Sequence, residues 1–213
     1  MEFRILGSTG ISVSAISFGA GPVPGLMTDA SSANLQRETI AMAIQAGINW
    51  FDTASTYGDG ESERSLGAAL NDLGAPHVHV ATKVRLMPEQ LESIKENVKA
   101  SVAASLQRLQ RERITLVQLH NSITHNRGDQ YTSLTPHDVL RPEGVLDAFQ
   151  ELQAEGLVQH IGLTGLGDMD ALAEVIRSGQ FETKQVCYNI VNPSAGRRLP
   201  AGFEGENYCE IIR

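Results

Sequence analysis

The chain has 213 residues, with 17 Lys or Arg against 25 Asp or Glu, so its formal net charge is −8. An acidic chain without a basic block is a poor match for nucleic acid, because nucleic-acid binding depends on neutralising phosphates. Two cysteines, Cys187 and Cys209, cannot form a disulfide framework or a four-cysteine zinc site. No apolar run approaches the ~20 residues that span a bilayer, and the N-terminus does not resemble a signal peptide. We therefore expect a soluble, cytoplasmic globular domain, which favours an enzyme.

The first elements in chain order are a hairpin and a short strand. Two apolar segments, residues 3–6 and 13–16, flank the turn-rich residues 7–10, a pattern typical of a β-hairpin. Residues 16–21 follow as a short strand that ends in glycines. Residues 21–33 are rich in Pro, Gly and Ser and are predicted to form a loop.

Helices and strands then alternate along the chain. Residues 88–109 have apolar side chains at three- and four-residue steps, and glycines close several of the other helical patterns. Residues 121–142 and 196–205 are predicted loops, and residues 207–213 are predicted to begin a helix. The predicted helices cover residues 35–46, 61–73, 88–109, 145–154 and 168–178, and the predicted strands lie near residues 16, 48, 78, 114, 160 and 185.

Alternating strands and helices predict a parallel sheet, either doubly wound or closed as a barrel. Gly19, Ala20 and Gly21 are followed by Pro22 and Pro24 rather than by a helix that opens with G-x-G-x-x-G, which argues against a dinucleotide-type doubly wound domain. A (β/α)8 TIM barrel with an N-terminal β-hairpin therefore remains. Such a barrel takes about 250 residues, so six strands predict an incomplete one, with about six of eight βα units. We expect one domain over residues 1–213, truncated at its C-terminus.

The ends of three neighbouring strands carry polar side chains. Asp52 ends the second strand, with Tyr57 in the loop after it, while Lys83 and His120 end the third and fourth strands. Because neighbouring strands lie ~4.8 Å apart, these residues are expected to converge at the C-terminal rim of the barrel. A phenol is a weak acid in neutral water, and an adjacent ammonium favours its ionised form. Such a set suits protonation of a carbonyl oxygen while a hydride adds to its carbon.

Longer motifs around these residues resemble those of the aldo-keto reductases. Residues 50–58, WFDTASTYG, follow the D-T-A-x-x-Y-G signature of that family, and residues 60–67, GESERSLG, fit the segment after it. The strand Ala81-Thr82-Lys83 matches the family's lysine strand. Further matches are residues 105–109 before 116–120, residues 156–162, and residues 185–189. The resemblance covers nearly the whole chain.

This resemblance implies an NAD(P)H-dependent carbonyl reductase or alcohol dehydrogenase that acts on an aldehyde, ketone or sugar. Tyr57 would be the general acid or base, Lys83 and Asp52 its tuning pair, and His120 the group that orients the substrate oxygen. NADP or NAD is the expected cofactor, and no metal is expected. The implied cofactor-binding residues are Gly19, Ala20, Gly21, Asp52, Thr164, Gly165 and Gln185, and the implied substrate contacts are Tyr57, His120 and Asn121.

Some features of the chain depart from the family pattern. Many members have Ser-Asn where this chain has Thr164-Gly165, so a side-chain amide donor is missing there. The loop over residues 121–142 is polar, with one aromatic residue, and is expected to line the substrate mouth. It suggests a polar substrate such as a sugar or hydroxy-aldehyde.

Two other functions stay open from the sequence alone. His77-x-His79 resembles a two-histidine metal motif of barrel hydrolases, but four residues of strand put His79 roughly 13 Å below the active rim. The other alternative is a non-catalytic, cofactor-binding regulatory member of the same family. The partners we expect are a small carbonyl or sugar substrate and possible further copies of the chain, without nucleic acid or membrane.

Overall fold

The computed structural model describes residues 1–21, 25–200, 202 and 207–212. The chain opens with an antiparallel hairpin of β1 (Phe3–Ile5) and β2 (Ser12–Ser14), as predicted. The amide of Asn49 fixes this hairpin to the sheet, because its Oδ1 accepts a hydrogen bond from the Ser14 N–H at 2.7 Å and its Nδ2 donates to the Ser12 carbonyl at 2.9 Å. The hairpin is thereby held beside the start of the second parallel strand.

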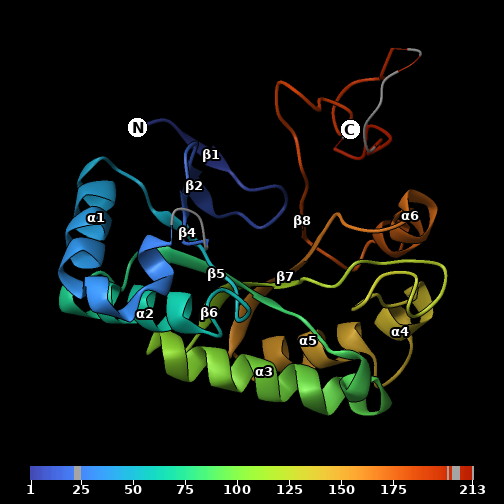
Figure 1. The fold of residues 1–213 in the computed structure, drawn as a ribbon, viewed down its shortest axis with the longest axis horizontal. Helices are drawn as coiled ribbons and strands as arrows, with labels where there is room; N and C mark the ends of the chain where they lie inside the picture. Colours follow the sequence, from blue (N-terminus) through green and yellow to red (C-terminus); the bar gives the residue numbers. More distant parts are fainter. Residues whose placement is uncertain (22–24, 201, 203–206, 213) are drawn as a thin grey trace.

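Six parallel strands form one sheet in the order β3-β4-β5-β6-β7-β8, which confirms the predicted α/β architecture as a half-barrel. Strands that follow one another in sequence are neighbours in space, as can be followed from β4 to β8 in Figure 1. The two edges of the sheet are β3 and β8. The strands are β3 (Phe18–Gly19), β4 (Trp50–Asp52), β5 (His79–Val84), β6 (Ile114–Leu119), β7 (Val158–Thr164) and β8 (Thr183–Gln185).

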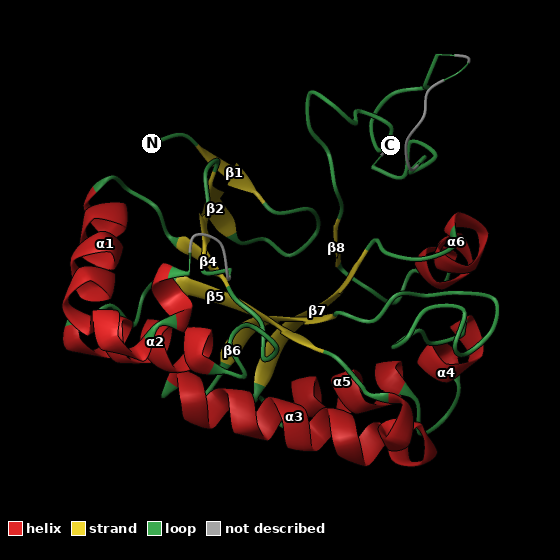
Figure 2. Ribbon diagram, viewed as in Figure 1, coloured by secondary structure: helices red, strands yellow, loops and turns green. Residues whose placement is uncertain are grey.

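Helices connect the strands and cover the outer face of the sheet. Figure 2 shows α2, α3 and α5 on one side of the sheet and the hairpin on the other. The helices are α1 (Ala33–Gln45), α2 (Glu61–Asp72), α3 (Ile94–Leu109), α4 (Pro136–Leu140), α5 (Val145–Ala154) and α6 (Met169–Arg177), and the 3-10 turns are η1 (Leu26–Thr28), η2 (Ala30–Ser32) and η3 (Pro88–Ser93).

The main core lies between the strands and these helices. Side chains alternate between the two faces of a strand, so outward residues such as Val80, Val117 and Ile161 meet the buried stripe of α3. The strand residues between these outward positions face the inside of the half-barrel, and Asp52 and Lys83 are among them. The fold thus separates an apolar outer layer from a polar inner one.

Two predicted segments differ in detail from the structure. Residues 88–109 form η3 followed by α3 rather than one helix. The Asn97 side chain donates to the carbonyls of Gln90 and Ser93, which supports the break. The predicted loop over residues 121–142 contains α4, which begins at a capping box between Thr135 and Asp138 with Pro136 at its first position.

The predictions for the C-terminal part are less accurate. The strand predicted near residue 185 covers Thr183–Gln185, and Cys187 beyond its end is exposed. The helix predicted to begin near residue 207 is wrong for the described residues, because Cys209 and Glu210 have φ of 50° and 55°, outside the helical region. Pro22 and Pro24 lie outside the described residues. Among the helices described, none has the length and apolar character needed to cross a membrane.

Candidate active site

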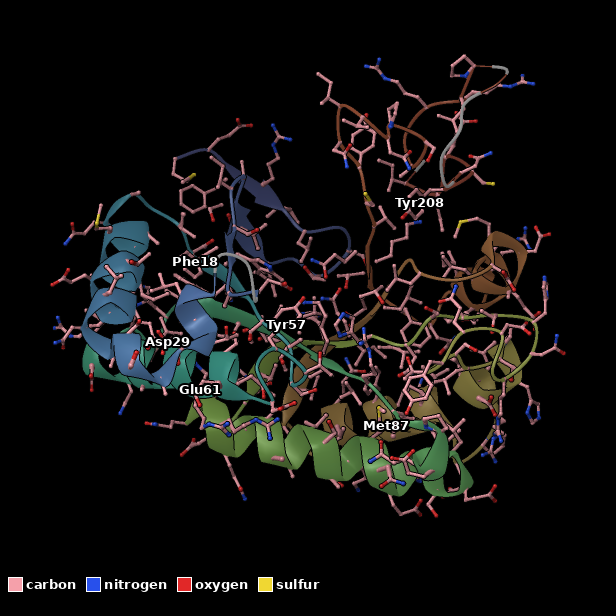
Figure 3. The ribbon with its side chains drawn as sticks, in the orientation of Figure 1. Phe18, Asp29, Tyr57, Glu61, Met87 and Tyr208 are labelled. Atoms are coloured by element: carbon pink, nitrogen blue, oxygen red, sulfur yellow. The ribbon has the colours of Figure 1, made fainter. Side chains whose placement is uncertain are left out.

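The four residues predicted for the rim lie at the C-terminal ends of three adjacent strands. Asp52 ends β4, Lys83 is the second-last residue of β5, and His120 directly follows β6. Tyr57 lies in the loop between β4 and α2, near the middle of the molecule in Figure 3. The parallel register brings these strand ends to one edge of the sheet, so the predicted convergence is present in the structure.

Lys83 and Asp52 form a buried ion pair. The Lys83 ammonium lies 2.6 Å from Asp52 Oδ2 and donates a second hydrogen bond to the Thr53 carbonyl at 2.8 Å. The lysine side chain is 2% exposed and the aspartate side chain 15% exposed. A buried ammonium requires such partners, because desolvation without them would be very costly. The pair therefore fixes a cation at one place under the rim.

Tyr57 is packed between this cation and the histidine. The Lys83 Nζ lies 5.2 Å from the centroid of the Tyr57 ring, and the His120 ring meets the same ring edge-on at 6.0 Å between centroids. Backbone hydrogen bonds from Tyr57 N–H to the Ala54 carbonyl and from Ser62 N–H to the Tyr57 carbonyl hold the loop. The phenol is thus positioned by a short, internally bonded turn.

His120 is a neutral imidazole at physiological pH. Burial, and then the charges of Arg85 and Lys83, lower its pKa from the usual 6.5 to about 3. Its Nδ1 is buried and has no hydrogen-bond partner among the described residues. A neutral imidazole with an unused ring nitrogen is suited to hydrogen-bond a substrate oxygen.

The lowered pKa of His120 predicts how stability depends on pH. The unfolded chain protonates this histidine below about pH 6.5, whereas the folded chain keeps it neutral down to about pH 3, so its contribution to stability is lost as the pH falls below 6.5. We expect the urea midpoint to fall more between pH 7 and pH 5 in the wild type than in His120→Gln. Equal falls in the two proteins would contradict a buried neutral histidine.

The glycine-flanked end of β3 adjoins Tyr57. The Ala20 N–H donates to the Asp52 carbonyl at 2.8 Å, so residues 19–21 run beside the ion pair. A side chain built on Gly21 would lie 3.9 Å from the Tyr57 ring, and one built on Gly19 would meet no atom within 4 Å. The small residues therefore leave open space next to the phenol.

Three of the predicted cofactor residues lie at the ends of the last two strands: Thr164 ends β7, Gly165 follows it, and Gln185 ends β8. Thr164 is buried, and its hydroxyl donates to the Leu119 carbonyl at 3.0 Å. A Cβ on Gly165 would lie 2.5 Å from the side chain of Val186, so the glycine permits a close approach of the chain after β8. Gln185 is exposed, and it accepts a hydrogen bond from Gln118. A cavity of about 240 Å³ inside the half-barrel is lined by Gln185, Asp52 and Gln118, among others.

Asn121 does not lie where the sequence led us to expect. Its side chain is fully buried, its Oδ1 accepts from the Leu86 N–H, and its Nδ2 donates to the carbonyls of Leu86 and Thr132. Both amide hydrogens are therefore used by backbone groups, so the predicted direct substrate contact at Asn121 is not supported. The residue instead joins the ends of β5 and β6 to the loop beyond them.

Comparison with known proteins shows which family the chain matches. A model of the aldo/keto reductase family matches residues 15–200. The chain belongs to this family. L-galactose dehydrogenase of Arabidopsis thaliana is 35% identical over 168 residues, and an NADH-specific methylglyoxal reductase of Escherichia coli is 30% identical over 212 residues. These matches cover 78% and 91% of this chain but 49% and 61% of the relatives.

Solved structures of the family have the same fold. A Klebsiella pneumoniae aldo-keto reductase in complex with NADPH superposes with a TM-score of 0.66 at 26% identity, over 88% of this chain and 59% of that one. The chain spans roughly half to two thirds of the length of these relatives.

Several residues that support the aldo/keto reductase site were not singled out from the sequence. The Ser62 hydroxyl donates to the Ala20 carbonyl at 2.6 Å and lies 2.7 Å from the Thr53 hydroxyl. Glu63 accepts a hydrogen bond from the Thr82 hydroxyl and pairs with Arg108. Thr53 directly follows Asp52, and Thr82 directly precedes Lys83. Because neighbouring residues of a strand face opposite sides, the sequence could have indicated that both threonines face α2.

The opposite end of the half-barrel holds the histidine pair. His79 is the first residue of β5 and packs against Trp50, while His77 is exposed in the turn before it. They border a cavity of about 700 Å³ together with Arg111, which is held by three backbone carbonyls. The part of the chain that the structure describes contains no group of three or more His, Cys, Asp or Glu side chains arranged to hold a metal ion.

Proposed function

We propose that this protein is an NAD(P)H-dependent carbonyl reductase or alcohol dehydrogenase. The observation that carries the proposal is the packing of the Tyr57 ring between the buried Lys83–Asp52 pair and the neutral His120. A phenol held against an ammonium is a proton donor suited to a carbonyl oxygen. The family membership supports the same reaction class.

A nicotinamide cofactor fits the residues beside this phenol. The open space along Gly19 and Gly21 adjoins the Tyr57 ring, and the buried Nδ1 of His120 has no partner among the described residues. When bound, NADPH or NADH supplies a hydride to the substrate carbon. We propose that Gly19, Ala20 and Gly21 border the nicotinamide. Asp52, Thr164, Gly165 and Gln185 are the further residues proposed to hold it.

In the proposed mechanism, the chain's own residues orient the carbonyl and move a proton. His120 hydrogen-bonds the substrate oxygen in its neutral form, and Tyr57 donates its hydroxyl proton to that oxygen as the carbonyl is reduced. Lys83 stabilises the phenolate that remains, and Asp52 keeps the ammonium charged and in place. In the reverse direction the Tyr57 phenolate accepts the proton of an alcohol.

The chain spans about half to two thirds of the curated relatives it matches, so activity, substrate and partners of the whole protein are part of the proposal. We propose one domain over residues 1–213, a cytoplasmic location, and a polar aldehyde or sugar as substrate. Self-association is compatible with the two open sheet edges, β3 and β8.

The test is a steady-state assay of NADPH and NADH oxidation with a panel of simple aldehydes, hydroxy-aldehydes and sugars. We expect turnover with at least one polar aldehyde, and no loss of activity after treatment with a chelator. Tight cofactor binding without any turnover would favour the regulatory alternative. A requirement for stoichiometric zinc would contradict the proposed hydride chemistry.

A further inference from the structure

A second cation lies at the rim, two residues beyond Lys83. Alternate residues of a strand face the same side, so Arg85 continues the inward row of β5 toward the mouth of the half-barrel. The register pairs Val84 with Leu119, and one further step sets Arg85 beside His120. At ~3.3 Å per residue, the arginine backbone lies roughly 7 Å above that of Lys83.

The backbone around Arg85 is fixed on both sides. The His120 N–H donates to the Val84 carbonyl at 2.8 Å. Asn121 binds both the N–H and the carbonyl of Leu86, which is 1% exposed. The backbone of Arg85 is therefore held in place by the hydrogen bonds of its two neighbours, Val84 and Leu86.

The Arg85 side chain is partly buried, and within the described part of the chain it makes no ion pair or hydrogen bond. Its Nε is shielded from solvent and has no hydrogen-bond partner among the described residues. Other half-buried guanidinium groups in the chain are satisfied: Arg108 pairs with the buried carboxylate of Glu63, and Arg111 donates to three backbone carbonyls. A desolvated guanidinium without an acceptor is costly, unless a ligand supplies one.

The described residues provide no carboxylate that pairs with the positive charge of Arg85. The charge of Lys83 is balanced by Asp52 at 2.6 Å. The Arg85 charge is close enough to His120 to contribute to the lowering of that histidine's pKa. The cation therefore lies next to the imidazole that is proposed to hold the substrate oxygen.

We propose that Arg85 is a specificity-determining residue that binds an anionic group, a carboxylate or a phosphate, on the carbonyl substrate. This inference rests on the proposed function and adds a substrate class to it. The planar guanidinium offers several donors to such a group, and the site lies beside the reacting carbonyl without taking part in proton transfer. The preferred substrates are aldehydes or ketones that carry an acidic group a few atoms from the carbonyl.

The test compares matched pairs of charged and neutral substrates. The wild type and Arg85→Gln are assayed with succinic semialdehyde against butyraldehyde and with glyceraldehyde 3-phosphate against glyceraldehyde. We expect kcat/KM of Arg85→Gln for an anionic member to fall roughly 10- to 100-fold, and that for its neutral partner to change less than about threefold. The semialdehyde and phosphate pairs distinguish a carboxylate site from a phosphate site.

Two variants act as controls. Arg64→Gln removes an exposed arginine on α2 and should leave both substrate classes unaffected. Arg85→Lys restores the charge without the planar fork and should recover part of the lost kcat/KM for the anionic substrates. Equal losses for charged and neutral substrates, or a loss confined to cofactor affinity, would overturn the assignment of Arg85.

Calorimetric titration with succinate and with inorganic phosphate separates this proposal from the proposed function. We expect wild-type protein to bind one of the two anions and Arg85→Gln to bind it at least 10-fold more weakly. Failure of the wild type to reduce even neutral aldehydes would count against the reductase function while leaving the titration to decide on Arg85. Absence of binding to both anions in the wild type would refute the anion site.

Discussion

Replacing Tyr57 by Phe is expected to lower kcat by ~10² or more in the carbonyl reductase assay. The substitution removes one hydroxyl and keeps the ring that packs against Lys83 and His120, so the neighbouring geometry should be preserved. The proton that the carbonyl oxygen needs would then have to come from water. The measurement is steady-state oxidation of NADPH or NADH, with cofactor affinity followed separately by fluorescence titration.

The control for Tyr57→Phe is Tyr131→Phe, which removes a hydroxyl from a ring that is 76% exposed in the loop before α4. That variant should keep the wild-type kcat, because its loop does not hold the phenol, the ammonium or the imidazole of the rim residues. If Tyr57→Phe retained full turnover, the assignment of the rim residues would fail, and a drop in both variants would indicate a general loss of folded protein.

Replacing Glu63 by Ala is expected to lower the free energy of unfolding by about 3–5 kcal/mol. The Glu63 side chain is fully buried, accepts from the Thr82 hydroxyl at 2.5 Å, and lies 2.6 Å from Arg108. Its removal leaves the guanidinium and the hydroxyl without an acceptor in a space that water cannot readily fill. Urea unfolding followed by the fluorescence of Trp50, the single tryptophan, measures the loss.

Glu61→Ala is the matched control, because Glu61 pairs with the half-exposed Arg64 three residues further along the same helix. An exposed ion pair of this kind contributes about 0–1 kcal/mol, so Glu61→Ala should be nearly neutral. Similar losses of unfolding free energy in Glu63→Ala and Glu61→Ala would contradict the proposed stabilising role of the buried Glu63 carboxylate. Glu63→Gln, which keeps an acceptor for Thr82, should fall between them.

The architecture of the half-barrel and the gathering of the rim residues could be predicted from the sequence. Apolar patterning and glycine stops marked the six parallel strands and every longer helix, although α4 was missed. Parallel strands necessarily bring their C-terminal ends together. Asp52, Lys83 and His120 each fall at such an end, so their proximity followed from topology alone. The parallel register then fixed which side chains share the inner face.

The remaining features depend on individual tertiary contacts that leave little trace in the local pattern. Asn121 follows the rim histidine, as a substrate contact would, yet its amide is taken up by the backbone of Leu86 and Thr132. Residues 185–189 match a motif of the family, yet pairing with β7 ends at Gln185 and Cys187 is exposed. The absence of a partner for the Arg85 Nε among the described residues could be seen only from the three-dimensional arrangement of their side chains.

The anchoring of Asn121 divides the mouth into a fixed and a variable part. The amide holds the end of β5, the end of β6 and residue Thr132 together, and the bridge between Ile123 and Leu134 closes the same loop at its base. Residues 125–131 between these anchors are exposed. Under the proposed function, insertions or substitutions there would alter the expected substrate mouth without moving the phenol, the ammonium or the imidazole. Selectivity and reaction chemistry can therefore diverge independently during evolution of this fold.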